Sequence, residues 1–99
     1  MEFAIIWSSA AKADLADIHE YLLAQNPQAA VRIPEDILLH VETLRTFPHI
    51  GPKVGADASG ESRWIACEDY RIVYRVDAEH HSIEVIALWH GSREAPPER

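Results

Sequence analysis

The sequence predicts an α+β domain in which an N-terminal helical hairpin packs on one face of an antiparallel β-sheet. Apolar residues recur at helical spacing over residues 9–24 and again over residues 27–46. After residue 60, short segments rich in β-branched and aromatic residues alternate with turn-forming stretches. The predicted order of elements is therefore β-α-α-β-β-β. A helical hairpin is too long a connection for a β-turn, so we expect the first strand to join the sheet away from the other strands.

Residues 2–7 form the first predicted strand. Their alternation puts Phe3, Ile5 and Trp7 on one side and Ala4 and Ile6 on the other. Both sides are apolar, which predicts a strand that is covered rather than peripheral.

The first helix begins after Ser8 or Ser9, either of which offers a capping hydroxyl, and it continues to about Ala24. Its apolar residues recur at spacings of four and three, so one stripe of the helix faces the sheet. The residues of this stripe are Ala11, Leu15, Ile18 and Leu22.

The second helix begins at Asn26-Pro27, because asparagine is a favoured N-cap and proline suits the first helical position. It is expected to end at about Thr46. Pro34 is an anomaly, because proline inside a helix costs roughly 3 kcal/mol. Either the helix kinks near residues 30–34 or it begins properly only there. The predicted core stripe is Ala30, Ile33, Ile37, Val41 and Leu44.

Residues 52–60 contain two glycines and little apolar content, which predicts one long flexible loop. Strands are expected at residues 63–67, 70–76 and 83–90, with a hairpin turn over residues 77–82. Residues 1–93 then form a single domain, and residues 94–99, which include Pro96-Pro97, form a flexible tail.

The composition limits the possible functions. The chain has 99 residues, enough for one core, and no apolar run approaches the ~20 residues that span a bilayer. The N-terminus lacks the features of a secretory signal, and Cys67 is the only cysteine, so we expect a cytoplasmic protein. The net charge of -7 disfavours general nucleic-acid binding, although most basic residues lie in the second half of the chain.

Alternation in the strand at residues 70–76 separates Ile72 and Tyr74 from Arg71 and Arg75. One face can therefore bury apolar side chains while the other displays guanidinium groups, which are costly to bury unpaired. We expect these arginines and Arg63 to gather on one side of the strands and to meet another macromolecule.

Sequence motifs for metal or nucleotide binding are absent, and we expect no cofactor. His90 ends the last strand and could work with the arginines to promote attack by a ribose 2′-hydroxyl in RNA cleavage. Alternatively, His90 caps the strand by hydrogen bonding to backbone.

The chain resembles the RelE/ParE superfamily of toxins from bacterial type II toxin–antitoxin systems. The similarity lies in the order and spacing of short pieces along nearly the whole chain: Trp7-Ser8, Ala11, Asp14-Leu15, Ile18, Tyr21, Asn26-Pro27, Ala30, Leu44, Phe47-Pro48, Gly51, Arg63, Tyr70 to Val76, and His90-Gly91-Ser92-Arg93. The resemblance implies a small α+β toxin that a ParD-like antitoxin neutralises within a hetero-oligomer.

The resemblance allows two activities. ParE-like members inhibit DNA gyrase without catalysis, and the long helical hairpin and the His-Gly-Ser-Arg ending favour this branch. RelE-like members cleave mRNA on the ribosome without a metal. The residues carried over for ribonuclease activity are Arg63, Arg71, His90 and Arg93, and those for target or antitoxin binding are Arg63, Arg71, Arg75, Trp89 and Arg93. A third reading is an antitoxin-binding remnant without a target.

Overall fold

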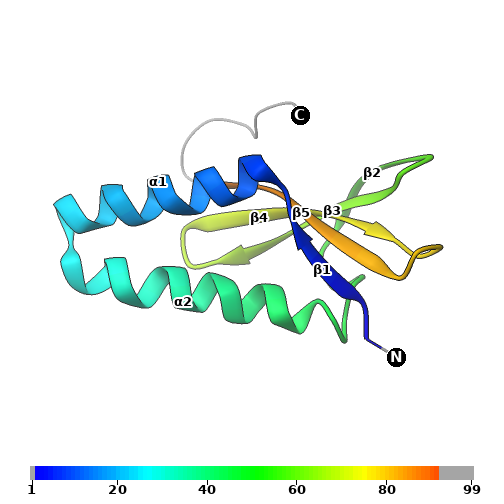
Figure 1. The fold of residues 1–99 in the computed structure, drawn as a ribbon, viewed down its shortest axis with the longest axis horizontal. Coiled ribbons are helices and arrows are strands. Elements are labelled where there is room, and N and C mark those ends of the chain that lie inside the picture. The colour runs from blue at the N-terminus through cyan, green and yellow to red at the C-terminus, as the bar shows by residue number, and fades with distance from the viewer. Residues whose placement is uncertain (1, 92–99) are drawn as a thin grey trace.

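The computed structural model describes residues 2–91. Figure 1 shows two long helices lying side by side along a twisted sheet, which confirms the predicted α+β class. In chain order the elements are β1 (Ala4–Trp7), α1 (Ser9–Gln25), α2 (Pro27–Thr43), β2 (Lys53–Asp57), β3 (Gly60–Cys67), β4 (Tyr70–Asp77) and β5 (Ser82–His90). The predicted tail at residues 94–99 lies outside the described residues.

The five strands form one mixed sheet in the order β1-β5-β4-β3-β2. The predicted meander of β3, β4 and β5 is antiparallel, as expected, while β1 lies parallel to β5. The chain between β1 and β5 includes both helices and the strands β2, β3 and β4, so it is long enough to make the crossover that a parallel pair requires. β1 is thus an edge strand, and the expectation of a covered strand is wrong, since Ile6 is 55% exposed.

Side-chain caps fix the starts of both helices, as the sequence predicts. The Ser8 hydroxyl accepts a hydrogen bond from the Ala11 N–H at 2.9 Å and donates to the Ile86 carbonyl at 2.9 Å. This links the start of α1 to β5. The Asn26 side chain accepts from the Ala29 N–H at 3.3 Å and thereby caps α2.

Pro34 lies inside α2, which begins at Pro27 and continues without interruption to Thr43. The alternative of a helix that begins only near Pro34 is therefore wrong. Ile33 and Ile37 on either side of the proline are buried in the core. Their burial, at roughly 1.5–3 kcal/mol for each side chain, offsets the cost of the proline.

The prediction of a flexible loop over residues 52–60 is also wrong, because Lys53–Asp57 forms β2 and pairs antiparallel with β3. Every residue of this edge strand is exposed, so no buried face produces the alternation by which strands are recognised. A bulge between Lys53 and Gly55 further disturbs the pattern.

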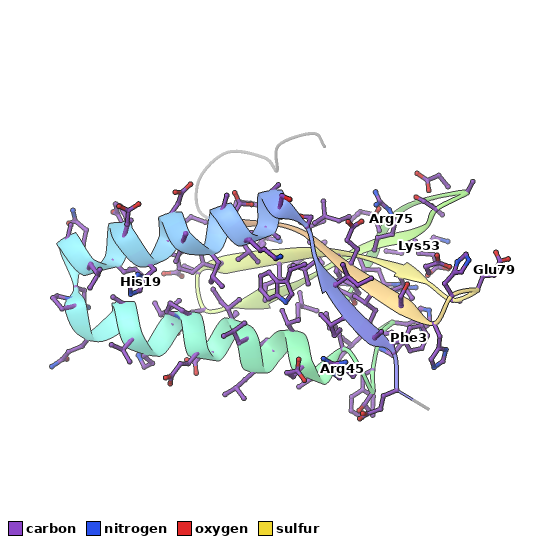
Figure 2. All side chains as sticks on the ribbon, viewed as in Figure 1. Phe3, His19, Arg45, Lys53, Arg75 and Glu79 are labelled. Atoms are coloured by element: carbon purple, nitrogen blue, oxygen red, sulfur yellow. The ribbon has the colours of Figure 1, made fainter. Side chains whose placement is uncertain are left out.

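Both helices cover the same face of the sheet. The predicted stripes supply the helical side of the core, where Leu15 is partly buried and the others are buried, with Leu44 in a second cluster beside Tyr74, Val76 and Ile83. The even-numbered residues of β4 are buried on the face of the sheet that the helices cover. Its odd-numbered residues are half-buried on the opposite face. At the end of α2, Arg45 lies near Phe3, and its guanidinium donates to the Phe3 carbonyl at 3.4 Å (Figure 2).

Candidate functional site: the open face of the sheet

The face of the sheet away from the helices, which we call the open face, combines aromatic and cationic side chains. Cross-strand partners point to the same face, so the pairing register assigns its members. Trp64 pairs with Val73, and Arg71 pairs with Ala66 on one side and with Trp89 on the other. The open face of the three central strands consists of Ser62, Trp64, Ala66, Arg71, Val73, Arg75, Asp77, Ser82, Glu84, Ala87 and Trp89.

Arg71 is held in place near one end of this face, on the strand β4 and one pair away from the turn that joins β3 to β4. Its guanidinium carbon lies 4.1 Å from the centroid of the Trp64 ring, within the range of a cation–π contact. Gly91 lies against its other side, because a Cβ atom added at Gly91 would be 3.1 Å from the Arg71 Nε. No carboxylate in residues 2–91 lies within ion-pair distance of Arg71. Arg71 therefore offers an oriented positive charge to a partner.

A cleft of about 270 Å³ lies next to Arg71 at the turn between β3 and β4. Glu68 and Asp69 contribute to its wall, and Glu68 accepts a hydrogen bond from Arg32 of α2 at 2.6 Å. The remaining wall residues are Ala66, Tyr70, Arg71 and Gly91. This end of the open face is thus concave and bears both signs of charge.

Arg75 lies on the same face as Arg71, but its charge is partly neutralised. Its Nη1 is 3.2 Å from the Glu84 carboxylate on β5, the residue opposite it in the register. Its Nε is buried and has no hydrogen-bond partner among the described residues. Figure 2 shows Arg75 on the side of the molecule near the β2–β3 hairpin.

Arg63 does not lie on the open face. It pairs with Tyr74, so it points to the helix side, and the expectation that the three arginines share one face is wrong for this residue. Its Nη1 donates to the Gly51 carbonyl at 2.6 Å and to the His49 carbonyl at 3.2 Å, and its Nη2 is 2.9 Å from Glu61. These contacts hold the segment between α2 and β2 against the sheet.

His90 also lies on the helix side, opposite Tyr70, and their rings meet edge to face with centroids 5.2 Å apart. Trp89, its neighbour, lies on the open face beside Arg71. Arg93 is outside the described residues. Among the described members of the predicted ribonuclease set, Arg71 is on one face of the sheet and Arg63 and His90 are on the other.

Sequence reasoning did not identify Trp64 as a site residue, although the sequence contained a usable signal. The two-residue turn Glu68-Asp69 places Cys67 opposite Tyr70. Counting back from this pair puts Trp64 opposite Val73, on the face of Arg71, and puts Arg63 on the other face.

Within residues 2–91, no group of three or more His, Cys, Asp or Glu side chains is placed to hold a metal ion. None of the helices in the described part of the chain has the length and apolar character needed to cross a membrane.

The contacts of Arg63 predict a structural role. Replacing Arg63 with alanine should lower the free energy of unfolding by about 2–3 kcal/mol, because two carbonyls and a carboxylate lose a charged donor in a largely buried place. Urea denaturation followed by circular dichroism measures this loss. Arg45→Ala, which removes an exposed ion pair with Glu42 and one long hydrogen bond to the Phe3 carbonyl, should cost less. An Arg63→Ala chain as stable as the wild type would contradict the structural role.

Acid should destabilise the fold through three carboxylates, of which Asp57 is exposed and Glu61 and Asp77 are partly exposed. Hydrogen bonds from Ser59, Arg63 and His80 lower the pKa values of Asp57, Glu61 and Asp77 respectively. A carboxylate whose pKa is lower in the folded chain stabilises it at neutral pH, and this contribution is lost as the pH falls through the folded pKa. The unfolding free energy should therefore fall below about pH 4.

Urea midpoints measured at a series of pH values check this expectation. The Asp77→Asn variant should show a shallower fall than the wild type, because it removes one of the three groups. A variant with an unchanged pH profile would contradict the assignment.

Comparison with known proteins places this geometry in context. The sequence model of one family, described as the ParE toxin of the type II toxin–antitoxin system parDE, matches residues 5–95. No curated protein matches the sequence.

Several solved structures share the fold. A chain of the chromosomal ParDE toxin–antitoxin system from P. aeruginosa is 21% identical with a TM-score of 0.72, covering 90% of this chain and 96% of that one. A chain of the archaeal RelE–RelB complex from Pyrococcus horikoshii OT3 is 15% identical with a TM-score of 0.70, and the match covers 95% of this chain and 100% of that one. A chain of the toxin–antitoxin complex RelBE2 from Mycobacterium tuberculosis is 21% identical with a TM-score of 0.56, and the match covers 91% of this chain and 99% of that one. At these identities the likeness shows the fold alone.

Proposed function

We propose, since the chain belongs to the ParE toxin family of type II toxin–antitoxin systems, that it inhibits DNA gyrase and is neutralised by a cognate ParD-like antitoxin. On this proposal it is a binding inhibitor that works in the cytoplasm, rather than an enzyme. The expected outcome in a cell without the antitoxin is growth arrest.

The main support for the proposal is the environment of the Arg71 side chain. It stacks on Trp64, lies beside Trp89 in the sheet, and has no carboxylate partner among the described residues. Tryptophan and arginine are the residue types that contribute most to protein–protein binding, because they combine apolar area with directed polar groups. A fixed cation between two aromatic side chains therefore suits recognition of an acidic patch on a protein target.

The antitoxin part of the proposal has separate support. Large apolar side chains remain exposed on the helices and on the segment that follows them, which a monomeric chain gains nothing by presenting to water. A wrapping partner would cover such side chains. They are Tyr21, Leu23, Val31, Leu38, Leu39, Phe47 and Ile50. The similar structures named above are described as toxin–antitoxin systems or complexes.

The alternative function is that of a RelE-like mRNA interferase. The similarity of the fold to the RelE–RelB complex is the observation that favours it. That activity needs a base and cations around one scissile phosphate. Because Arg71 and His90 lie on opposite faces of the sheet, this geometry favours binding over catalysis.

Parallel assays with the purified chain test the proposal. We expect the chain to inhibit supercoiling of relaxed plasmid by purified gyrase and to leave mRNA intact in a reconstituted translation reaction. Intact supercoiling together with mRNA cleavage that His90→Ala abolishes would replace the proposal with the interferase. Activity in neither assay, with no growth arrest on expression, would favour the remnant without a target.

A further inference from the structure

We propose that Gly91 is a positioning residue, because its missing side chain leaves a slot that holds Arg71 against Trp64 and aims it at a carboxylate of the target. The inference rests on the proposed function for the identity of that target, whereas the slot is a property of this chain alone. The glycine of the His-Gly-Ser-Arg ending thereby has a physical role in the site.

The Arg71 side chain is contacted from the two strands that flank β4. From β3, the Trp64 ring lies with its centroid 4.1 Å from the guanidinium carbon. From the end of β5, the Gly91 N–H donates to the carbonyl of Asp69, two residues before Arg71, at 2.5 Å. A Cβ atom added at Gly91 would be 3.1 Å from the Arg71 Nε and 3.4 Å from its Cγ. Because β3 and β5 lie on opposite sides of β4, the two contacts enclose the Arg71 side chain.

The backbone at Gly91 does not itself require glycine. Its φ is not in the positive region that favours glycine, whereas Gly60 has a φ of 131°. A side chain at Gly91 would instead be too close to its neighbours, at 3.1 Å from both the Arg71 Nε and the Asp69 carbonyl oxygen. That carbonyl is held by the Gly91 N–H, so the flexible Arg71 side chain has to move. Movement toward Trp64 is blocked by the ring, and Arg71 would therefore leave the stack.

The slot decides what Arg71 can bind. Stacking on Trp64 occupies a flat side of the guanidinium group, while its N–H groups lie in the plane of the group and stay available. A guanidinium held in this way matches the two oxygens of a carboxylate, and less conformational entropy is lost on binding than for a free arginine. The partner group is therefore an aspartate or glutamate side chain of the target. The cleft of about 270 Å³ that Arg71 and Gly91 both line gives this side chain access.

Nuclear magnetic resonance of the free chain tests the slot without gyrase. Protons above an aromatic ring resonate upfield, so the Arg71 side-chain protons should lie upfield of their positions in a Trp64→Leu chain. Gly91→Val should lose most of this shift, because valine displaces Arg71 from the ring. Gly91→Ala adds only a methyl group and should lose less of it. An unchanged shift in both glycine variants would overturn the proposal.

Supercoiling assays measure the consequence for binding. Gly91→Val should raise the concentration for half-inhibition about tenfold, because Arg71 no longer presents a fixed guanidinium group. In the Arg71→Lys background the same change should raise it about twofold or less, since lysine has no planar group to hold in the slot. Equal losses in the two backgrounds would mean that valine blocks the surface or damages the fold, and would overturn the positioning role.

The two measurements also separate this proposal from the proposed function. If the wild type leaves gyrase supercoiling unchanged, the proposed function fails, while the shift of the Arg71 protons still decides whether Gly91 holds Arg71 on Trp64. If the wild type inhibits gyrase and Gly91→Val inhibits equally well, the positioning role is rejected and the proposed function stands.

Discussion

The Arg71→Glu chain should lose inhibition of gyrase, with the concentration for half-inhibition rising by about thirtyfold or more. The substitution removes the one cation of the open face that has no carboxylate partner in the described structure, and it places a negative charge over the Trp64 ring. Reversing a charge at the centre of an interface typically costs at least about 2 kcal/mol, which corresponds to roughly thirtyfold in affinity. Supercoiling assays over a range of toxin concentrations measure the change.

Two matched variants make this result specific. Lys12→Glu has the same change in net charge at an exposed position of α1 and should inhibit like the wild type. Arg71→Lys keeps the charge but loses the planar stacking on Trp64, so its half-inhibition should lie between those of the wild type and Arg71→Glu. If Arg71→Glu inhibits as strongly as Lys12→Glu, the open face is not where gyrase is bound.

The Gly51→Ala chain should be less stable than the wild type by about 3 kcal/mol or more. A Cβ atom there would lie 2.0 Å from the Trp64 carbonyl oxygen, and both are backbone positions that cannot rotate away. The loop is also fixed from two sides, since the Gly51 N–H donates to the Tyr74 hydroxyl and its carbonyl accepts from Arg63. Relief of the clash must therefore break buried hydrogen bonds or strain the backbone.

Gly55→Ala is the natural control for this prediction. No atom lies within 4 Å of the Cβ position at Gly55, so the substitution should change stability by no more than about 0.5 kcal/mol. Urea melts of the three chains give both values. A Gly51→Ala chain within the error of Gly55→Ala would mean that the segment before β2 is not packed against β3 as described.

The sequence predicts most of the fold because its patterns arise from burial. Each helix has a stripe facing one sheet, so Ile18 in α1 and Ile37 in α2 are recognisable as core from spacing alone. β2 has no buried residue, and nothing in its composition distinguishes it from a loop. The sequence does not decide whether the second helix continues through Pro34. The free-energy cost of a proline inside a helix is offset by the tertiary packing of its neighbours, which the sequence does not show.

The site is harder to predict, because alternation within one strand does not say which residues of the next strand share its face. Arg71 and Arg75 were correctly placed together, since they belong to the same strand. The wrong face predicted for Arg63 and the omission of Trp64 from the site have the same cause. Both depend on the register between β3 and β4, which pairs Arg63 with Tyr74 and Trp64 with Val73. Whether an arginine is available to a partner depends on distant carboxylates and carbonyls, and this information exists only in three dimensions.

The three tryptophans allow the most direct test of the open face as the gyrase-binding surface. Trp64 and Trp89 lie on that face, whereas Trp7 pairs with Val85 and packs against the core on the helix side. Hydroxyl-radical oxidation of each side chain, quantified by mass spectrometry with and without purified gyrase, compares them within one molecule. Binding through the open face predicts strong protection of Trp64 and Trp89 and an unchanged Trp7. Protection of Trp7 alone, or of none of the three when gyrase is saturated with toxin, would contradict it.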